Sequence, residues 1–357
     1  MEPTLRQNTI SKAISLIRFP AVVLIVILHA YTAARGSISD IGSEAYYKIS
    51  YILSMNLGNM GVPLYFTISG LLFFYHYNKQ FSYKRKIQSR FKTLVIPYFC
   101  WNLITLAIFF LLQNIEWTKM YFSGNNKLII DYTFTDFLRA FWDVGNGFPV
   151  LSPYWYIRNL FILQLCSPIL FYLIKYLKGF YLLVIGIIWA MTPTLTFTYS
   201  SIFFFSLGAY ISIHHIDLEQ QTERFFKFIV TFFILLLAFE FYLHFYLPNP
   251  YSIYVQKVLF VCGVICFFTL AIRAAKNQIT ISNYLGKASF FIYTTHYPIM
   301  LGVRKLSLKW MGESTEWGNV LTYFGSAIIT IGISLFLYEC MRRCMPKVLA
   351  FTTGERS

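Results

Sequence analysis

The sequence predicts an all-α fold, a polytopic bundle of about ten transmembrane helices with both termini in the cytoplasm. Hydrophobic residues make up 57% of the 357-residue chain, against roughly 45–50% in an ordinary soluble domain. Charged residues make up only 13%. The apolar stretches follow one another, and no loop between them is long enough for a soluble domain. We therefore expect a single membrane-embedded domain over residues 1–357, with a core of about 12–342.

The expected spans follow from length and composition, because a helix needs about 20 mostly apolar residues to cross the hydrocarbon core. The first begins after a polar lead and has no small-residue cleavage site behind it, so we expect a retained helix and not a signal peptide. The fifth and sixth divide the uncharged stretch 179–213 at Pro193, and they either cross fully or form one re-entrant pair. The ten spans are 14–34, 59–77, 94–112, 154–173, 179–194, 197–213, 228–247, 255–272, 283–303 and 320–341.

Basic residues predict the orientation, because cytoplasmic loops retain Lys and Arg. With the N-terminus inside, the expected cytoplasmic segments hold 19 of the 30 basic residues and the outer segments hold nine. The other two, Arg18 and Arg158, lie inside spans. We expect a multi-pass protein of the plasma or inner membrane, in contact with membrane lipids.

The net charge of +15 does not indicate a nucleic-acid partner, since the basic residues gather in the loops that fix membrane topology. The composition also excludes a disordered chain and a disulfide-rich secreted module. The six cysteines lie in or at the ends of apolar helices, and no His or carboxylate forms a metal-binding pattern with them. We expect buried free thiols and no metal cofactor. The sequence leaves the oligomeric state open.

Two ionisable residues lie inside the first span, Arg18 and His29. Such groups cost at least about 2.5–3.5 kcal/mol each in a bilayer, so each is a functional candidate. Eleven residues make three helical turns plus about 20°, so the two share one helix face about 16 Å apart. Arg18 lies near the cytoplasmic side and His29 toward the outer side. The structural alternative is that Arg18 extends to lipid phosphates and His29 hydrogen-bonds a neighbouring helix.

Three more ionisable candidates lie in the outer halves of later spans: Arg158 in the fourth, Glu240 in the seventh and His296 in the ninth. At similar depth, Arg158, His296 and His29 could meet around one polar cavity. Glu240 is then a partner for Arg158 or for a histidine. A helix–helix hydrogen bond explains Glu240 equally well.

The densest basic segment is the cytoplasmic loop after the second span, Lys84-Arg85-Lys86-Ile87-Gln88-Ser89-Arg90-Phe91-Lys92. If the loop is helical, Lys86 and Arg90 share a face. The phosphates of a cytosolic cofactor such as coenzyme A need such a cluster. Basic loops also fix topology and bind anionic lipid headgroups without any cofactor.

Taken together, these residues and their surroundings resemble the acyltransferase family 3 group of integral membrane proteins. The matching pieces run across nearly the whole chain. Any one of them is apolar sequence around one or two polar residues, but six in order at fitting depths are specific. They are Arg18 to His29, Val62 to Gly70 with Ser69, Leu94 to Asn102, Trp155 to Leu160, Phe205 to Gly208, and Ile292 to His296.

The resemblance implies an enzyme that moves an acyl group, usually acetyl from cytosolic acetyl-CoA or another acyl-CoA, to a hydroxyl handled at or across the membrane. It also implies a saccharide or a lipid-linked or cell-surface glycan as the acceptor. His29 would act as base or acyl carrier, and Arg18 would hold a coenzyme A phosphate or stabilise developing charge. Arg158, His296 and Glu240 would line the acceptor side.

One departure from the family concerns the basic loop, where Arg-x-x-Arg is frequent. No such pair occurs between 84 and 92, and Lys86-x-x-x-Arg90 is the nearest substitute. A rival class is a transporter or flippase of saccharides or anions, since buried Arg, His and Glu also line substrate pathways. Against it, the sequence has no duplicated halves and no matched pair of interrupted helices. A non-catalytic scaffold of a glycan-assembly complex is a third alternative without a feature that favours it.

Overall fold

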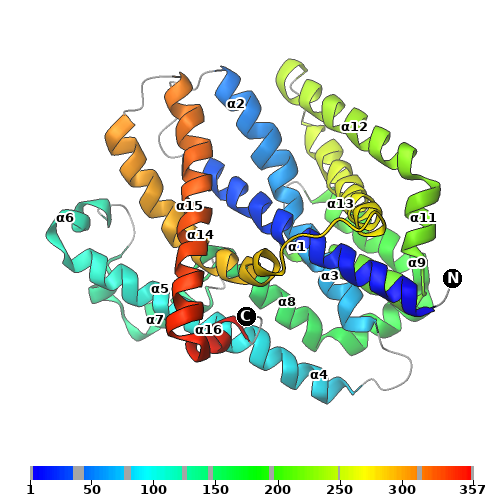
Figure 1. The fold of residues 1–357 in the computed structure, drawn as a ribbon, viewed down its shortest axis with the longest axis horizontal. Helices are drawn as coiled ribbons and strands as arrows, with labels where there is room; N and C mark the ends of the chain where they lie inside the picture. The colour runs from blue at the N-terminus through cyan, green and yellow to red at the C-terminus, as the bar shows by residue number, and fades with distance from the viewer. Residues whose placement is uncertain are drawn as a thin grey trace.

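The computed structural model describes residues 3–34, 44–75, 82–122, 127–143, 148–192, 197–247, 250–311 and 316–354. Within these ranges every regular secondary-structure element is a helix, and there is no strand, which confirms the all-α class (Figure 1). The expected division at Pro193 lies outside the described residues.

Long helices form the bundle, and several shorter ones lie in the connections. The N-terminal half contains α1 (Pro3–Ala34), α2 (Glu44–Ser50), the π-helix η1 (Tyr51–Leu57), η2 (Gly58–Met60), α3 (Gly61–Phe74), α4 (Tyr83–Arg90), the π-helix η3 (Phe91–Val95), α5 (Ile96–Asn114), α6 (Glu116–Lys119), α7 (Phe134–Phe141) and α8 (Trp155–Leu165). The C-terminal half contains α9 (Ser167–Met191), α10 (Phe197–Ile213), α11 (Leu218–Arg224), α12 (Phe226–Tyr246), α13 (Ser252–Lys276), α14 (Asn283–Met311), α15 (Glu316–Cys344) and α16 (Pro346–Thr353).

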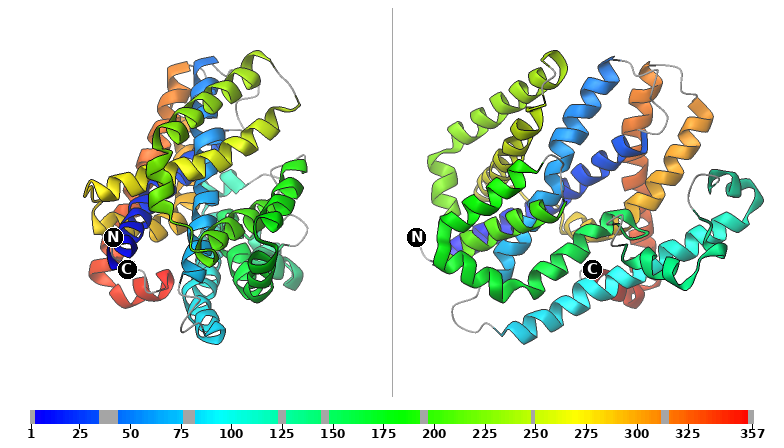
Figure 2. Two further views of the ribbon diagram at one scale, coloured as in Figure 1. Left: turned by 90° about the vertical axis from the view of Figure 1, so that its right-hand side faces the viewer. Right: turned by 180° about the vertical axis from the view of Figure 1, so that it is seen from behind.

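Helix α1 crosses the middle of the bundle, where it packs against α3, α13, α14 and α15 (Figures 1 and 2). Its inward face is made of small and branched apolar residues, including Ala21, Val22, Ile25 and Val26, which are almost fully buried. Pro20 lies inside the helix without ending it. A central α1 places the residues of its polar face next to several neighbouring helices at once.

The second span begins earlier than expected, because α2, η1, η2 and α3 form one apolar run from Tyr46 to Phe74. The polar residues that lower the hydropathy of its first half are buried and paired. Ser54 Oγ donates to Ile27 O at 2.7 Å, and Asn56 Nδ2 donates to the Glu240 carboxylate. These partners come from other helices, so the sequence of this segment alone could not reveal them.

The expected number of ten spans is not confirmed. By length and composition, seven described helices could cross a membrane, or eight if the bent pair α10 and α11 forms one broken span. Helix α14 is long enough, but it carries too many polar residues to be among the seven. Helix α9 breaks at Lys178, whose backbone is not helical (φ 51°, ψ −132°). That break falls between the expected fourth and fifth spans.

Helices α3 and α10 cross at two glycines, Gly70 and Gly208. A Cβ atom at Gly70 would overlap the carbonyl of Phe205, and one at Gly208 would overlap the carbonyl of Thr67. The absence of side chains therefore lets the two backbones touch. This crossing fixes the rotation of α3, and with it the direction of the neighbouring Ser69.

Both ends of the described chain lie toward the end of the molecule that holds α4 (Figures 1 and 2). The C-terminal helix α16 packs against α5, where the indole Nε1 of Trp101 donates to Thr352 O at 2.9 Å. The cytoplasmic location of both termini stays a prediction. All six cysteines are free, but only Cys266 is buried, so the expectation of buried thiols was wrong for Cys166 and Cys344, which are exposed.

Candidate active site

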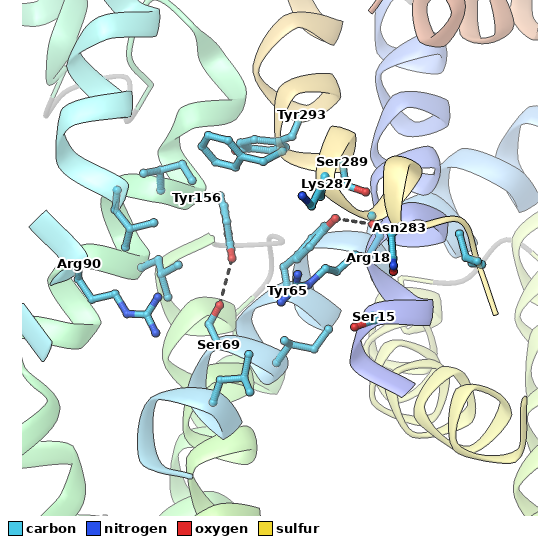
Figure 3. A pocket seen from close by; sticks show the side chains of 18 of the residues that line it. Ser15, Arg18, Tyr65, Ser69, Arg90, Tyr156, Asn283, Lys287, Ser289 and Tyr293 are labelled. Atoms are coloured by element: carbon cyan, nitrogen blue, oxygen red, sulfur yellow. Dashed lines mark hydrogen bonds between the residues drawn. The ribbon is translucent and has the colours of Figure 1, made fainter. Parts of the chain in front are cut away.

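A cavity of about 460 Å³ opens among five elements: α1, α3, the α4–η3 segment, α8 and α14. It lies beside the half of α1 that holds Arg18, and its lining does not include His29, Arg158 or His296, the residues that the sequence suggested could meet around one cavity. Each of the five contributes a polar side chain to the lining (Figure 3): Arg18, Ser69, Arg90, Tyr156 and Lys287.

Tyrosine and serine hydroxyls line the inner wall of the cavity (Figure 3). Tyr65 OH donates to the backbone oxygen of Arg18 at 2.6 Å, and this bond ties α3 to α1. Ser69 Oγ and Tyr156 OH are hydrogen-bonded at 3.3 Å. The Tyr293 hydroxyl donates to Pro153 O and its ring packs edge-on against Tyr156. These bonds hold rigid rings around the inner end of the cavity.

Three cations surround the cavity. Arg18 and Lys287 are exposed, whereas Arg90 is half-buried on the opposite side (Figure 3). Of the two residues predicted from the basic loop, only Arg90 lines the cavity. The Lys86 ammonium instead donates to Phe73 O at the end of α3 and lies 5.1 Å from the Phe73 ring centre. Lys86 therefore caps a helix end.

Two histidines of the expected spans, His29 and His296, lie side by side, although they are 267 positions apart in the sequence. The ring centres of His29 on α1 and His296 on α14 are 5.1 Å apart, with the rings tilted by 46°. Tyr297 packs edge-on against His29 at 5.4 Å. His296 is fully buried, and its Nδ1 donates to Tyr293 O at 2.7 Å. Because Tyr293 also lines the cavity, the histidine pair lies one helical turn beyond the cavity wall.

Arg158 contacts residues of another part of the molecule, around the start of α8. Its Nε donates to Asn159 Oδ1 at 3.3 Å, and its guanidinium lies over the Trp142 ring at 5.3 Å. Asn159 in turn donates to Ser201 Oγ at 3.4 Å. Arg158 thus belongs to a polar and aromatic cluster near the start of α8.

Glu240 is completely buried and serves as an acceptor for the π-helix η1. Tyr51 OH donates to its Oε1 at 2.5 Å and Asn56 Nδ2 donates to its Oε2 at 2.5 Å. Gln256 extends the network by donating to Asn56 Oδ1 at 3.1 Å. These contacts favour the helix–helix hydrogen bond among the two explanations of Glu240.

The sequence did not single out Lys287, Tyr65, Tyr156 or Tyr293 as site residues. Lys287 is one of the 19 basic residues that the sequence predicts for the cytoplasmic segments. Tyrosines are frequent in this chain, with 27 in all, so no single one stood out. The only local signal was the closeness of Lys287 and Tyr293 to His296 on one expected helix.

Chemically, the arrangement combines an anion-binding cavity with a pair of imidazoles just beyond its wall. Two arginines and a lysine suit phosphate groups, and a neutral imidazole can accept a proton or carry an acyl group. Within the described parts of the chain, no group of three or more His, Cys, Asp or Glu could hold a metal ion.

Comparison with known proteins gives a consistent set of matches. A family model described as an acyltransferase domain matches residues 11–339 of the chain. The succinoglycan biosynthesis protein ExoH of Rhizobium meliloti (strain 1021) is 24% identical over 364 residues, which cover 98% of this chain and 93% of that protein. No solved structure matches the chain significantly.

Proposed function

The chain belongs to the acyltransferase family whose domain model matches residues 11–339, and from this membership we propose that it moves an acyl group from cytosolic acyl-CoA to a saccharide hydroxyl. Acetyl is the expected acyl group. The acceptor is a polysaccharide unit or a lipid-linked or cell-surface glycan. The protein works as a multi-pass enzyme of the plasma or inner membrane.

The observation that carries the donor assignment is the cavity with Arg18, Arg90 and Lys287. Coenzyme A bears a diphosphate and a further phosphate, and charge-assisted hydrogen bonds from Arg and Lys are strong phosphate contacts. The cations come from three different elements, so they are arranged around the cavity and do not form a solvated stripe on one helix.

The acceptor assignment is supported by the similar protein ExoH, whose name places it in succinoglycan biosynthesis. Succinoglycan is a polysaccharide, and a saccharide offers hydroxyl groups to an acyl donor. The resemblance found in the sequence pointed to the same acceptor class.

His29 performs the chemistry in this proposal, because acyl transfer from a thioester needs a base for the hydroxyl proton or a nucleophile that carries the acyl group. In the direct route, the acceptor oxygen bonds to the acyl carbon and its proton passes to His29. The bond from the acyl carbon to sulfur then breaks, and the leaving thiolate takes that proton.

A transfer assay on membranes tests the proposal. Membranes that contain the wild-type protein should move label from [¹⁴C]acetyl-CoA to extractable saccharide, and control membranes should not. A transporter or flippase of saccharides or anions would show no such transfer. Absence of label in every saccharide fraction would therefore reject the enzyme assignment.

A second experiment tests the donor cavity. Arg90→Gln should raise the KM for acetyl-CoA about tenfold or more, because a charged contact is worth about 1.5–3 kcal/mol. The matched control is Lys84→Gln, an exposed residue of the same helix outside the cavity lining. Equal effects of the two substitutions would contradict the assignment of the cavity to the donor.

A further inference from the structure

We propose that His296 is the positioning residue of His29: its Nε2 accepts a hydrogen bond from Nδ1–H of His29 and leaves Nε2 of His29 as the reactive nitrogen. The inference rests on the proposed function, in which His29 is the base or acyl carrier. It adds a role for His296 and identifies the reactive atom.

The tautomer of His296 follows from its hydrogen bond. Its Nδ1 lies 2.7 Å from Tyr293 O, and a carbonyl oxygen can only accept. Nδ1 therefore carries the proton, and Nε2 of the neutral ring is an acceptor. This Nε2 is buried and has no hydrogen-bond partner among the described residues. A buried acceptor without a donor costs about 1–3 kcal/mol, so the site is set to receive a donor.

His29 offers the matching donor. Its Nδ1 is also buried without a hydrogen-bond partner in the described part of the chain. The two ring centres are 5.1 Å apart, with the ring planes tilted by 46°. At this separation of the ring centres, a nitrogen of one ring that faces a nitrogen of the other lies within hydrogen-bond distance.

This contact decides which nitrogen of His29 reacts. With its proton on Nδ1, His29 presents the lone pair of Nε2. The acceptor hydroxyl gives its proton to this Nε2 while its oxygen bonds to the acyl carbon, and the departing thiolate takes the proton back. Throughout the step, His296 holds the Nδ1–H and stabilises the transient imidazolium, as an acceptor behind a catalytic histidine does in other enzymes.

Two substitutions of His296 separate positioning from packing. His296→Asn retains an amide donor for Tyr293 O but lacks an acceptor at the position of Nε2. His296→Gln reaches the position of Nε2 with a carbonyl oxygen but loses the bond to Tyr293 O. With [¹⁴C]acetyl-CoA and saccharide extracted from the membranes, we expect Asn to lower kcat about 10²-fold or more and Gln to lower it less than tenfold. The KM for acetyl-CoA should not change in either variant.

The opposite order, with Asn active and Gln inactive, would show that His296 only packs the helix, and equal losses would also reject the positioning role. Wild-type protein that transfers no label rejects the proposed function itself, so the two failures are distinguishable. NMR spectra of the ¹⁵N-histidine-labelled wild-type protein measure the tautomer of His29 independently of the His296 variants. The signals of His29 are identified as those that are lost in His29→Gln. They should show His29 as the Nδ1–H tautomer, and an Nε2–H tautomer would overturn the inference.

Discussion

Arg18 and His29 lie on the same face of α1, but their surroundings differ. Arg18 is exposed at the cavity, whereas His29 packs between His296 and Tyr297. About 16 Å of helix separates them. An acyl-CoA also separates its charged phosphates from its thioester by a long arm, so one helix can hold the phosphates at one end and perform the chemistry at the other.

For Arg158, we expect an effect on the acceptor and not on the donor, because the residue lies outside the cavity lining and in the expected outer half of its span. Arg158→Ala should raise the acceptor requirement or abolish transfer, while acetyl-CoA binding stays measurable. Arg139→Ala, at an exposed position of α7, is the control. Loss of acetyl-CoA binding with unchanged acceptor affinity would contradict this role.

Glu240→Gln should reduce stability more than catalysis. Glutamine has one carbonyl oxygen where the carboxylate accepts from both Tyr51 and Asn56, so one buried donor loses its partner, at a cost of about 1–3 kcal/mol. Thermal unfolding in detergent should show a lower Tm, with transfer per folded molecule within tenfold of wild type. An unchanged Tm together with abolished transfer would instead place Glu240 in the active site.

For the helices, the sequence predicted the secondary structure and the depth of each polar residue in its span. It did not predict which helices pack against one another. The spacing of Arg18 and His29 on one helix face is a property of α1 alone and could be derived from the helical repeat. That His29 meets His296 depends on the packing of α1 against α14, which periodicity does not encode. Lys86 shows the same limit, because its partner is a backbone carbonyl of α3 that no side-chain pattern reveals.

The polar residues of the site lower the mean hydropathy of the helix that carries them. Helix α14 carries Lys287, Ser289 and His296 and is therefore absent from the apolar spans identified by composition. The sequence nevertheless predicts a span at 283–303, because apolar residues surround these polar ones. Function thus lowers the very signal from which membrane helices are predicted.

The close crossing of α3 and α10 predicts that alanine at either crossing glycine lowers the stability of the protein. Gly70→Ala and Gly208→Ala each place a methyl group against a backbone carbonyl of the partner helix, and overpacking of this kind costs about 1–3 kcal/mol or more. Both variants should lower the Tm in detergent and the yield of folded protein. Gly325→Ala on α15 is the matched control, since a Cβ there meets no atom within 4 Å. Equal stability of all three variants would contradict the close crossing.

At the scale of the whole molecule, an even number of spans is needed to place both termini on one side. The seven apolar helices alone would place them on opposite sides, whereas the ten expected from the sequence would not. Both ends of the described chain lie toward the same end of the bundle as α4. The basic residues of α4 lead us to predict that this end is cytoplasmic.

Fusions to reporter proteins test this topology. Green fluorescent protein joined to the C-terminus should fluoresce, and alkaline phosphatase joined there should be inactive, because the first folds in the cytoplasm and the second outside it. The same pattern is expected for fusions after residue 90, in the basic segment. Active phosphatase at either position would reverse the predicted orientation.

The central claim, acyl transfer by His29, is tested most directly by comparing three proteins in one assay of label transfer from [¹⁴C]acetyl-CoA: wild type, His29→Ala and His29→Gln. His214→Gln is the control for loss of an imidazole outside the histidine pair, since His214 contacts Ile174 O. General base catalysis is typically worth about 10²–10⁴-fold, so Ala and Gln should both lose nearly all transfer while the proteins still insert and fold. His29→Gln that retains more than about a tenth of wild-type transfer would contradict the claim and make His296 the first alternative.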